Sequence, residues 1–407
     1  MKRLIYNIGC LYGILPPSVH KLEGEAMSSV NSLEDAYLEI IDGNISSFGP
    51  RESLRSMDAD ELIDANGGFV MPTFCDSHSH VVYAGSRDGE FRDKIAGLSY
   101  EEIAARGGGI LNSADLLHET SEDELFEQSM ERVRELMAMG TGALEIKSGY
   151  GLSTEDELKM LRVIRRIRDA VPIVIRSTFL GAHAVSRRFG SDREGYVNLV
   201  CDEMLPAVAE AQLADYVDVF CDEGFFTPED TARILEKAAE YGLRGKIHAN
   251  ELAISGGVQV GVSHNALSVD HLERTGDEEI ACLKGGGTMP TMLPGASFFL
   301  GMPYGRAKAF IGAGLPLALA SDYNPGSSPS GDMRFVLALA CIKMKLTPEQ
   351  AFNACTINSA FAMGVEDILG SITVGKRASL IITRRLPSFT FIPYSHHTPF
   401  IERLILP

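Results

Sequence analysis

Two histidines separated by one residue are the first sign of chemistry in this sequence. His78 and His80 close an apolar run, and residues i and i+2 of a β-strand point to the same side, so both imidazoles would face one site. His248, His271 and Asp322 each end a later apolar segment. Two close histidines, a third imidazole and a carboxylate suit a borderline divalent ion such as zinc, with a water in the open position. The sequence therefore predicts a metal site.

The segments that must position these residues are short apolar strands separated by helix-sized stretches. Helices are predicted over 121–140 and 153–170, because each begins with Ser or Thr followed three residues later by an acid, the capping-box signature. Strand–helix alternation of this kind indicates an α/β fold, either a doubly wound sheet or a (β/α)8 barrel. The expected strands lie at 68–80, 142–148, 173–183, 216–222, 244–250, 266–273, 287–294 and 316–322.

The positions of the polar residues favour the barrel. His80, His183, His248, His271 and Asp322 lie at or near the C-terminal ends of their strands, where a (β/α)8 barrel places its active site. A doubly wound nucleotide-binding sheet would carry Gly-x-Gly-x-x-Gly after an early strand, and no such run follows any of the expected strands. We therefore predict a TIM-like (β/α)8 barrel.

Both ends of the chain are β-rich. Residues 36–49 predict two strands joined at Asp42-Gly43, a strong two-residue hairpin signal, and the β-branched runs of 370–385 are broken by Gly375. We expect the two ends to form one small discontinuous β-sandwich domain. The predicted boundaries are 1–65 for its N-terminal part, 66–363 for the barrel and 364–407 for its C-terminal part.

Composition and charge exclude several classes of protein. Of 407 residues, 45% are apolar and 23% charged, as in soluble globular proteins. A formal charge of −18 would repel nucleic acid and anionic membranes, so neither is an expected partner. Seven scattered cysteines without a C-x-x-C pair indicate reduced thiols, and the apolar stretch after Met1 lacks a signal-peptide cleavage site and predicts a first strand. Together these features predict a cytoplasmic protein.

The motifs around these residues resemble those of the amidohydrolase superfamily and, within it, the imidazolonepropionase family. H-x-H alone points to the superfamily, whereas the Ala-Gly-Ser-Arg, Glu-Ile-Lys-Ser-Gly-Tyr-Gly and Asp-x-Asn-Pro-Gly blocks are specific to the family. The resemblance covers nearly the whole chain, including the terminal segments. The residues that carry it are 78–87, 107–110, 145–151, 179–183, 201–206, 246–251, 270–273 and 321–327.

The resemblance implies an amidohydrolase-type barrel that opens the ring of a small molecule, 4-imidazolone-5-propanoate, to N-formimidoyl-L-glutamate in histidine degradation. It also implies a homodimer and one divalent or trivalent metal ion per subunit, zinc or iron. His78, His80, His248 and Asp322 match the metal ligands of the family. A bound ion would lower the pKa of its water to about 7 and polarise the ring carbonyl.

Three residues match positions that move protons in the family. Asp322 is suited to accept the proton of the attacking water, and His271 to activate that water or stabilise an oxyanion. Glu251, three residues after His248, would contact a ring nitrogen and protonate it as it leaves. The alternatives are a structural role for His271, a ligand role for His271 in the free enzyme, and an exposed or merely orienting carboxylate at Glu251.

The propanoate group of such a substrate needs a cation. Arg87 offers a planar fork for a carboxylate, Tyr150 can add a hydroxyl donor, and Tyr100 is a weaker third candidate. His183 matches a residue that reaches the substrate in the family. The last loop adds three more candidates, Asn324, Gly326 and Ser327.

Two alternatives concern the metal count and the reaction. Lys147 could be a carboxylated lysine in a two-metal site, or it could simply pair with Glu145 or another acid. A deaminase would use the same histidine, aspartate and glutamate set, but Arg87 with Tyr150 favours a substrate that carries a carboxylate. A non-catalytic barrel would be expected to lack at least one of these residues, and none is missing.

Overall fold

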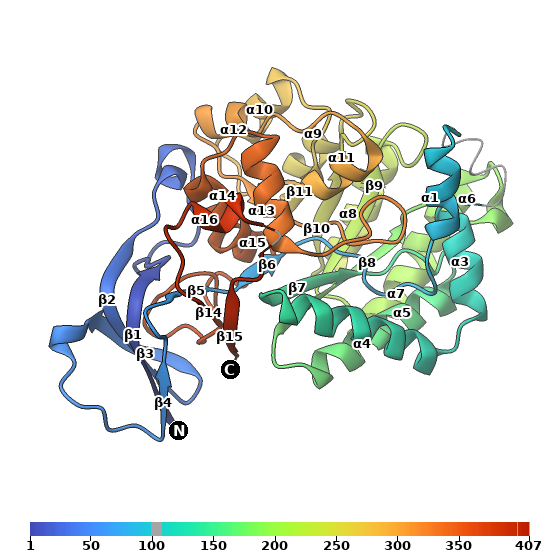
Figure 1. Ribbon diagram of the computed structural model, residues 1–407. Coiled ribbons are helices and arrows are strands. Elements are labelled where there is room, and N and C mark those ends of the chain that lie inside the picture. Colours follow the sequence, from blue (N-terminus) through green and yellow to red (C-terminus); the bar gives the residue numbers. More distant parts are fainter. Residues whose placement is uncertain (99–107, 397, 407) are drawn as a thin grey trace.

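A parallel barrel forms the larger part of the molecule (Figure 1). The structure is a computed structural model that describes residues 1–98, 108–396 and 398–406. Eight parallel strands follow one another around the barrel in chain order, which confirms the predicted fold class. They are β6 (Phe74–Asp76), β7 (Thr141–Lys147), β8 (Val174–Ala182), β9 (Tyr216–Cys221), β10 (Arg244–Ala249), β11 (Ser268–His271), β12 (Met289–Met292) and β13 (Ala318–Leu319).

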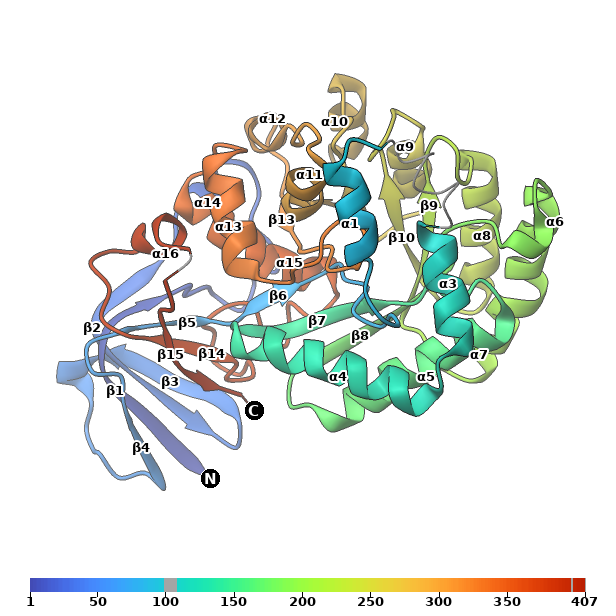
Figure 2. The same cartoon turned by 45° about the vertical axis from the view of Figure 1, so that its right-hand side comes forward.

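Helices cover the outside of the barrel (Figures 1 and 2). As predicted, Ser121 and Ser153 cap the helices that follow them, each accepting a hydrogen bond from the backbone N–H three residues on. The main helices are α1 (Asp88–Ile95), α3 (Ile110–Glu119), α4 (Glu122–Ala138), α5 (Thr154–Ala170), α6 (Arg193–Leu199), α7 (Leu205–Glu210), α8 (Pro228–Glu240), α9 (Gly257–Ser263), α10 (Asp277–Leu283), α11 (Pro294–Leu300), α12 (Ala307–Gly312), α13 (Met333–Ile342), α14 (Pro348–Cys355), α15 (Ile357–Ala362) and α16 (Phe391–Tyr394).

The barrel closes at the C-terminal ends of its first and last strands. The Asp322 N–H donates to the His78 carbonyl (3.0 Å), and the His80 N–H donates to the Tyr323 carbonyl (2.8 Å). Beneath them, buried Asp76 accepts from both the N–H (2.9 Å) and the hydroxyl (2.5 Å) of Ser321. Closure therefore brings the residues of the H-x-H motif beside Asp322.

The two ends of the chain form a separate seven-stranded sheet. The hairpin turns at Asp42-Gly43 as predicted, and both turn residues have positive φ. The sheet has its own apolar core, to which Ile5, Leu38 and Ile382 belong. Its strands are β1 (Lys2–Tyr12), β2 (Ser32–Ile41), β3 (Asn44–Pro50), β4 (Glu61–Asp64), β5 (Phe69–Pro72), β14 (Leu380–Thr383) and β15 (Ile401–Ile405). Both termini of the chain lie at this sheet (Figure 2).

The apolar run 68–80, expected to be one barrel strand, is divided between the two sheets. β5 pairs with β1 and β14 in the terminal sheet, and only β6 pairs with β7 in the barrel. Gly68 permits this join, because a Cβ there would lie 1.8 Å from the Thr383 carbonyl oxygen. The single-strand prediction is wrong, since a continuous apolar run does not reveal which sheet its residues pair with. The run before Gly375 likewise forms only an isolated bridge, Ile14–Ile372.

Two further observations concern the chain as a whole. All seven cysteines are unpaired. Among the described residues, no helix combines the length and the apolar character that crossing a lipid bilayer requires.

Candidate active site

Four side chains meet where the barrel closes. His78 Nε2 lies 3.1 Å from His248 Nε2 and 3.3 Å from His80 Nε2, and the latter two are also 3.3 Å apart. Asp322 Oδ1 lies 3.6 Å from His78 Nε2 and 3.5 Å from His80 Nε2. Donor atoms bound at about 2.0–2.2 Å to one ion would be spaced by about 3–3.5 Å. The four side chains are buried, and their spacing and donor chemistry fit a single metal ion; His271 also lies close enough to His78 and His248 to offer it a ligand atom.

Two buried carboxylates orient the histidine rings. Asp270 Oδ2 lies 2.7 Å from His78 Nδ1, and Asp218 Oδ2 lies 3.0 Å from His248 Nδ1. A proton held at each Nδ1 leaves the lone pair of each Nε2 directed at the common centre, which is the tautomer that binds a metal. The carboxylates therefore select the form of both rings.

Beneath these carboxylates lies a layer of buried charges. Lys147 Nζ contacts Glu145 (2.7 Å) and Asp218 (2.8 Å), and Lys246 Nζ contacts Glu145 (3.1 Å) and lies 3.8 Å from Asp270. Burial alone would lower the pKa of Lys147, but the three acids outweigh it and raise that pKa. A protonated lysine in ion pairs cannot be carboxylated, so the structure favours the ion-pair interpretation of Lys147 over a two-metal site.

His271 lies between two carboxylates on the other side of the cluster. Its Nε2 is 3.6 Å from Glu251 Oε2, and its Nδ1 is 3.5 Å from Glu273 Oε2. Burial raises the pKa of Glu251 to about 7, which allows this carboxyl to hold a proton near neutral pH. Burial would lower the pKa of His271, but Glu251 and Glu273 outweigh it and raise it. Glu251 is buried, so the interpretation of an exposed carboxylate is wrong.

Asp222, which the sequence did not single out, holds the loop that carries Glu251. Its Oδ2 accepts from the N–H groups of Glu251 (2.8 Å) and Leu252 (2.9 Å), and its Oδ1 accepts from Ala253 (3.1 Å). Asn250, just before Glu251, adopts a left-handed conformation with φ 59°. One buried carboxylate thus fixes three consecutive amides, and through them the direction of Glu251.

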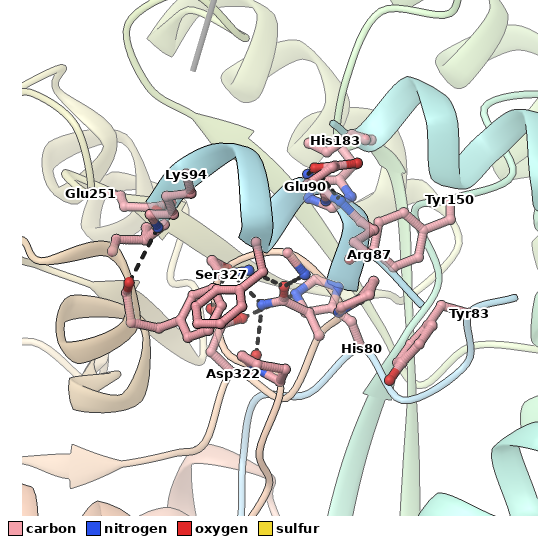
Figure 3. Close-up of a pocket in the computed structure, with 18 of the residues that line it drawn as sticks. His80, Tyr83, Arg87, Glu90, Lys94, Tyr150, His183, Glu251, Asp322 and Ser327 are labelled. Carbon is pink, nitrogen blue, oxygen red and sulfur yellow. Dashed lines mark hydrogen bonds and ion pairs between the residues drawn. The ribbon is translucent and has the colours of Figure 1, made fainter. Parts of the chain in front are cut away.

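These groups open into a cavity of about 680 Å³ at the barrel mouth (Figure 3). The structure brings together most of the residues predicted from the sequence, and His78 lies behind the cavity wall. Tyr100 falls outside the described residues. The predicted residues that line the cavity are His80, Arg87, Tyr150, His183, His248, Glu251, His271, Asp322, Asn324, Gly326 and Ser327.

Arg87 is the residue immediately before α1, and its side chain lines the cavity. Glu90 Oε2 accepts from its Nε (2.9 Å) and Nη2 (2.6 Å), which fixes the plane of the guanidinium. Nη1 lies against Gly326, where a Cβ would be only 2.2 Å away. Gly326 therefore serves the site by leaving room for Arg87.

His183 and Tyr150 form the adjacent wall. His183 Nδ1 donates to the Gly149 carbonyl (3.0 Å), and its ring stacks on His80 at 5.3 Å between centroids. Burial, with His248 nearby, lowers the pKa of His183 to about 3, so the ring is neutral. Its Nε2 is therefore an acceptor. The Tyr150 ring is buried, and its centroid lies 5.4 Å from that of the His183 ring.

The last loop orients Asp322 as well as lining the cavity. The Ser327 hydroxyl donates to Asp322 Oδ2 (3.2 Å). Asn324 donates to the Asp322 carbonyl (2.7 Å) and the Ser327 hydroxyl (2.7 Å), and its Oδ1 accepts from the Gly326 and Ser327 amides. The Asn324 side chain thus shapes the loop, whereas sequence reasoning assigned it to substrate.

Sequence reasoning missed several charged residues of the site, among them Glu90, Lys94, Asp218, Asp222 and Glu273. Glu90 and Lys94 follow Arg87 by three and seven residues, a helical spacing that would have placed them on one face of α1. Asp222 and Glu273 each follow the end of a barrel strand, and that position was the available signal.

A parallel eight-stranded barrel with a histidine–aspartate cluster at the C-terminal ends of its strands defines a metal-dependent hydrolase. Comparison with known proteins supports this class. The model of the family described as "Amidohydrolase family" matches residues 69–398. The fold is similar to that of E. coli guanine deaminase, with a TM-score of 0.75, 13% identity, and 100% of this chain and 97% of that chain covered.

Relatives with higher sequence identity indicate which amidohydrolases this chain resembles most specifically. Imidazolonepropionase of Christiangramia forsetii is 51% identical over 406 residues, covering 100% of this chain and 99% of the relative. Imidazolonepropionase of Flavobacterium johnsoniae is 52% identical over 406 residues with the same coverage. The chain belongs to the imidazolonepropionase family of amidohydrolases.

Replacing Asp222 should loosen the loop that carries Glu251. Asn has one acceptor oxygen, so Asp222→Asn leaves at least one of the amides of residues 251–253 without an acceptor, a penalty of roughly 1–3 kcal/mol for a buried group such as the Glu251 N–H. We expect the amides of residues 251–253 to exchange with solvent about tenfold faster or more, measured by hydrogen exchange, with β12 unchanged. Asp192→Asn, which alters the cap of α6, is the matched control. Equal protection of 251–253 in Asp222→Asn and the wild type would contradict this role.

Proposed function

We propose that this protein hydrolyses the cyclic amide bond of 4-imidazolone-5-propanoate, giving N-formimidoyl-L-glutamate. The observation that carries the proposal is a single cavity with the histidine–aspartate cluster in one wall and Arg87 in another. Such a cavity suits a small ring that bears a carboxylate side chain. Full-length identity of 51–52% to two imidazolonepropionases supports the same substrate.

The site is suited to one metal ion, zinc or iron, held by His78, His80, His248 and Asp322. When bound, the ion would supply Lewis acidity, acidify a water molecule and polarise the ring carbonyl. The chain prepares the site for this chemistry by fixing the ring tautomers through Asp218 and Asp270.

Two side chains transfer protons, and a third stabilises charge. Asp322, held by the Ser327 hydroxyl, accepts the proton of the attacking water. His271, placed between Glu251 and Glu273, stabilises negative charge that develops on the carbonyl oxygen. Glu251 donates a proton to the ring nitrogen as the carbon–nitrogen bond breaks. Water oxygen thus ends in the new carboxylate, and the nitrogen remains in the formimidoyl group.

The opposite walls of the cavity bind the substrate. Arg87 and Tyr150 bind the propanoate, and the neutral His183 accepts a hydrogen bond from a ring N–H through Nε2. Asn324, Gly326 and Ser327 close the last side, with Gly326 giving Arg87 its access.

The remaining assignments are proposals drawn from the strand pattern, composition and charge and, for the homodimer alone, from the resemblance. They are the domain boundaries at 1–65, 66–363 and 364–407, a homodimer, and a cytoplasmic location without nucleic-acid or membrane partners. One structural detail modifies the boundary at residue 65. β5 pairs with β1 and β14 of the terminal sheet, although it lies after that boundary.

The reaction itself tests the proposal against the deaminase alternative. Purified protein should convert freshly generated imidazolone propanoate to formimidoyl glutamate, followed by loss of the ring's ultraviolet absorbance and by product analysis. Ring opening releases no ammonia, whereas deamination of guanine or adenosine does. Ammonia release from nucleobases without turnover of imidazolone propanoate would overturn the proposal in favour of a deaminase.

Glu251→Gln should remove the proton donor while keeping the shape of the side chain. We expect kcat to fall about 10²- to 10⁴-fold, the usual contribution of a positioned acid or base, with metal content retained. His271→Ala should also retain metal, and Glu240→Gln, an exposed carboxylate on α8, should behave as wild type. Loss of metal from His271→Ala, together with a modest kcat change and weaker binding in Glu251→Gln, would reverse the two roles.

His248→Ala should remove a metal ligand. Metal content per subunit and activity should fall together, while circular dichroism and thermal unfolding show a folded barrel. His118→Ala, which removes an exposed histidine on α3, is the control and should keep its metal. Full metal occupancy in His248→Ala would show that the ligand set is wrong.

A further inference from the structure

Helix α1 places two cations on the cavity. Arg87 precedes its first residue and Lys94 lies in its last turn, seven residues apart, so that both face the same side of the helix after two turns. Both side chains line the cavity, and α1 crosses it with Arg87 and Lys94 at its two ends (Figure 3). Among the described residues, they are the only lysine or arginine side chains in the cavity wall.

The two cations differ in whether a carboxylate neutralises their charge. Glu90 accepts two hydrogen bonds from Arg87, so this pair has little net charge. Lys94 Nζ instead donates to the Phe299 carbonyl (3.2 Å) and lies 4.9 Å from the centroid of the Phe299 ring, and both of these partners are uncharged. In the part of the chain that the structure describes, Lys94 therefore stands in the cavity wall without an ion pair to a carboxylate, although Asp88, Glu251 and Asp322 line the same cavity.

The surroundings of Lys94 explain why this charge suits an anion. Phe299 stacks on Phe91, and the ammonium of Lys94 lies over the Phe299 ring. Burial and the proximity of Arg87 lower the pKa of Lys94. A partly desolvated ammonium without a counter-charge is unfavourable, and a ligand carboxylate would relieve that cost.

We propose that Lys94 is a second substrate-binding cation, which binds the carboxylate of the substrate together with Arg87 and sets the preference for anionic over neutral ligands. The inference rests on the proposed function and deepens it. Arg87, whose plane is fixed by Glu90, supplies direction, whereas Lys94 supplies net charge.

The test measures how variants at Lys94 bind a ligand that carries a carboxylate and its uncharged carboxamide. Lys94→Met should raise KM for imidazolone propanoate about 10- to 100-fold, as expected for a lost hydrogen bond to a charged group, with kcat changed far less. Binding of imidazole-4-propanoate, which has no ring carbonyl to hydrolyse, should weaken equally in calorimetry, while binding of its uncharged carboxamide should not change. Lys94→Arg should restore most of the affinity.

Lys237→Met, at a half-buried position on α8 that does not line the cavity, removes the same charge elsewhere and should leave the binding of both ligands unaffected. Thermal unfolding checks that each variant is folded. Wild-type turnover with an unchanged KM in Lys94→Met, or an equal loss for the acid and the carboxamide, would overturn the role of Lys94. Absence of wild-type turnover would instead overturn the proposed function, and calorimetry with the acid and the carboxamide would still decide whether Lys94 binds a carboxylate.

Discussion

The burial of five charged groups beneath the ligand histidines is the constraint on which the rest of the structure depends. Glu145, Lys147, Asp218, Lys246 and Asp270 have no exposed surface, and isolated charges in such surroundings would be strongly destabilising. They are tolerated because each lysine contacts two carboxylates. Three carboxylates and two ammonium groups leave a formal charge of −1, which favours a cation at the centre above them.

This network also explains why the barrel and the site are inseparable. Its members come from β7, β9, β10 and β11, so the ion pairs form only when these strands lie in the observed order. The three remaining members of the metal cluster, His78, His80 and Asp322, come together with barrel closure, where Asp322 donates its N–H to the His78 carbonyl. A change that opened the barrel between β6 and β13 would therefore separate the ligands before it affected the core.

Local sequence patterns predicted much of this arrangement. Pairings between residues far apart in the sequence could not be predicted from such patterns. His78, His80, His248 and Asp322 were found because each ends an apolar strand, and strand ends share one face of a barrel. The division of 68–80 at Thr73 was missed, because pairing partners over 300 residues away decide it. Asp222 was missed because its partners are backbone amides, which leave no trace in side-chain identity.

Chemistry and recognition come from different parts of this chain. The groups proposed for bond cleavage lie at or just after strand ends, where the buried network fixes them. The cations proposed to face the substrate side chain, Arg87 just before α1 and Lys94 within it, lie outside the barrel, with Gly326 and Phe299 as neighbours. A protein of charge −18 repels an anion over most of its surface, so local positive charge at the cavity is needed to admit one. Because Arg87 and Lys94 contact Glu90 and Phe299 rather than the buried network, their charges can define the ligand without disturbing the metal ligands.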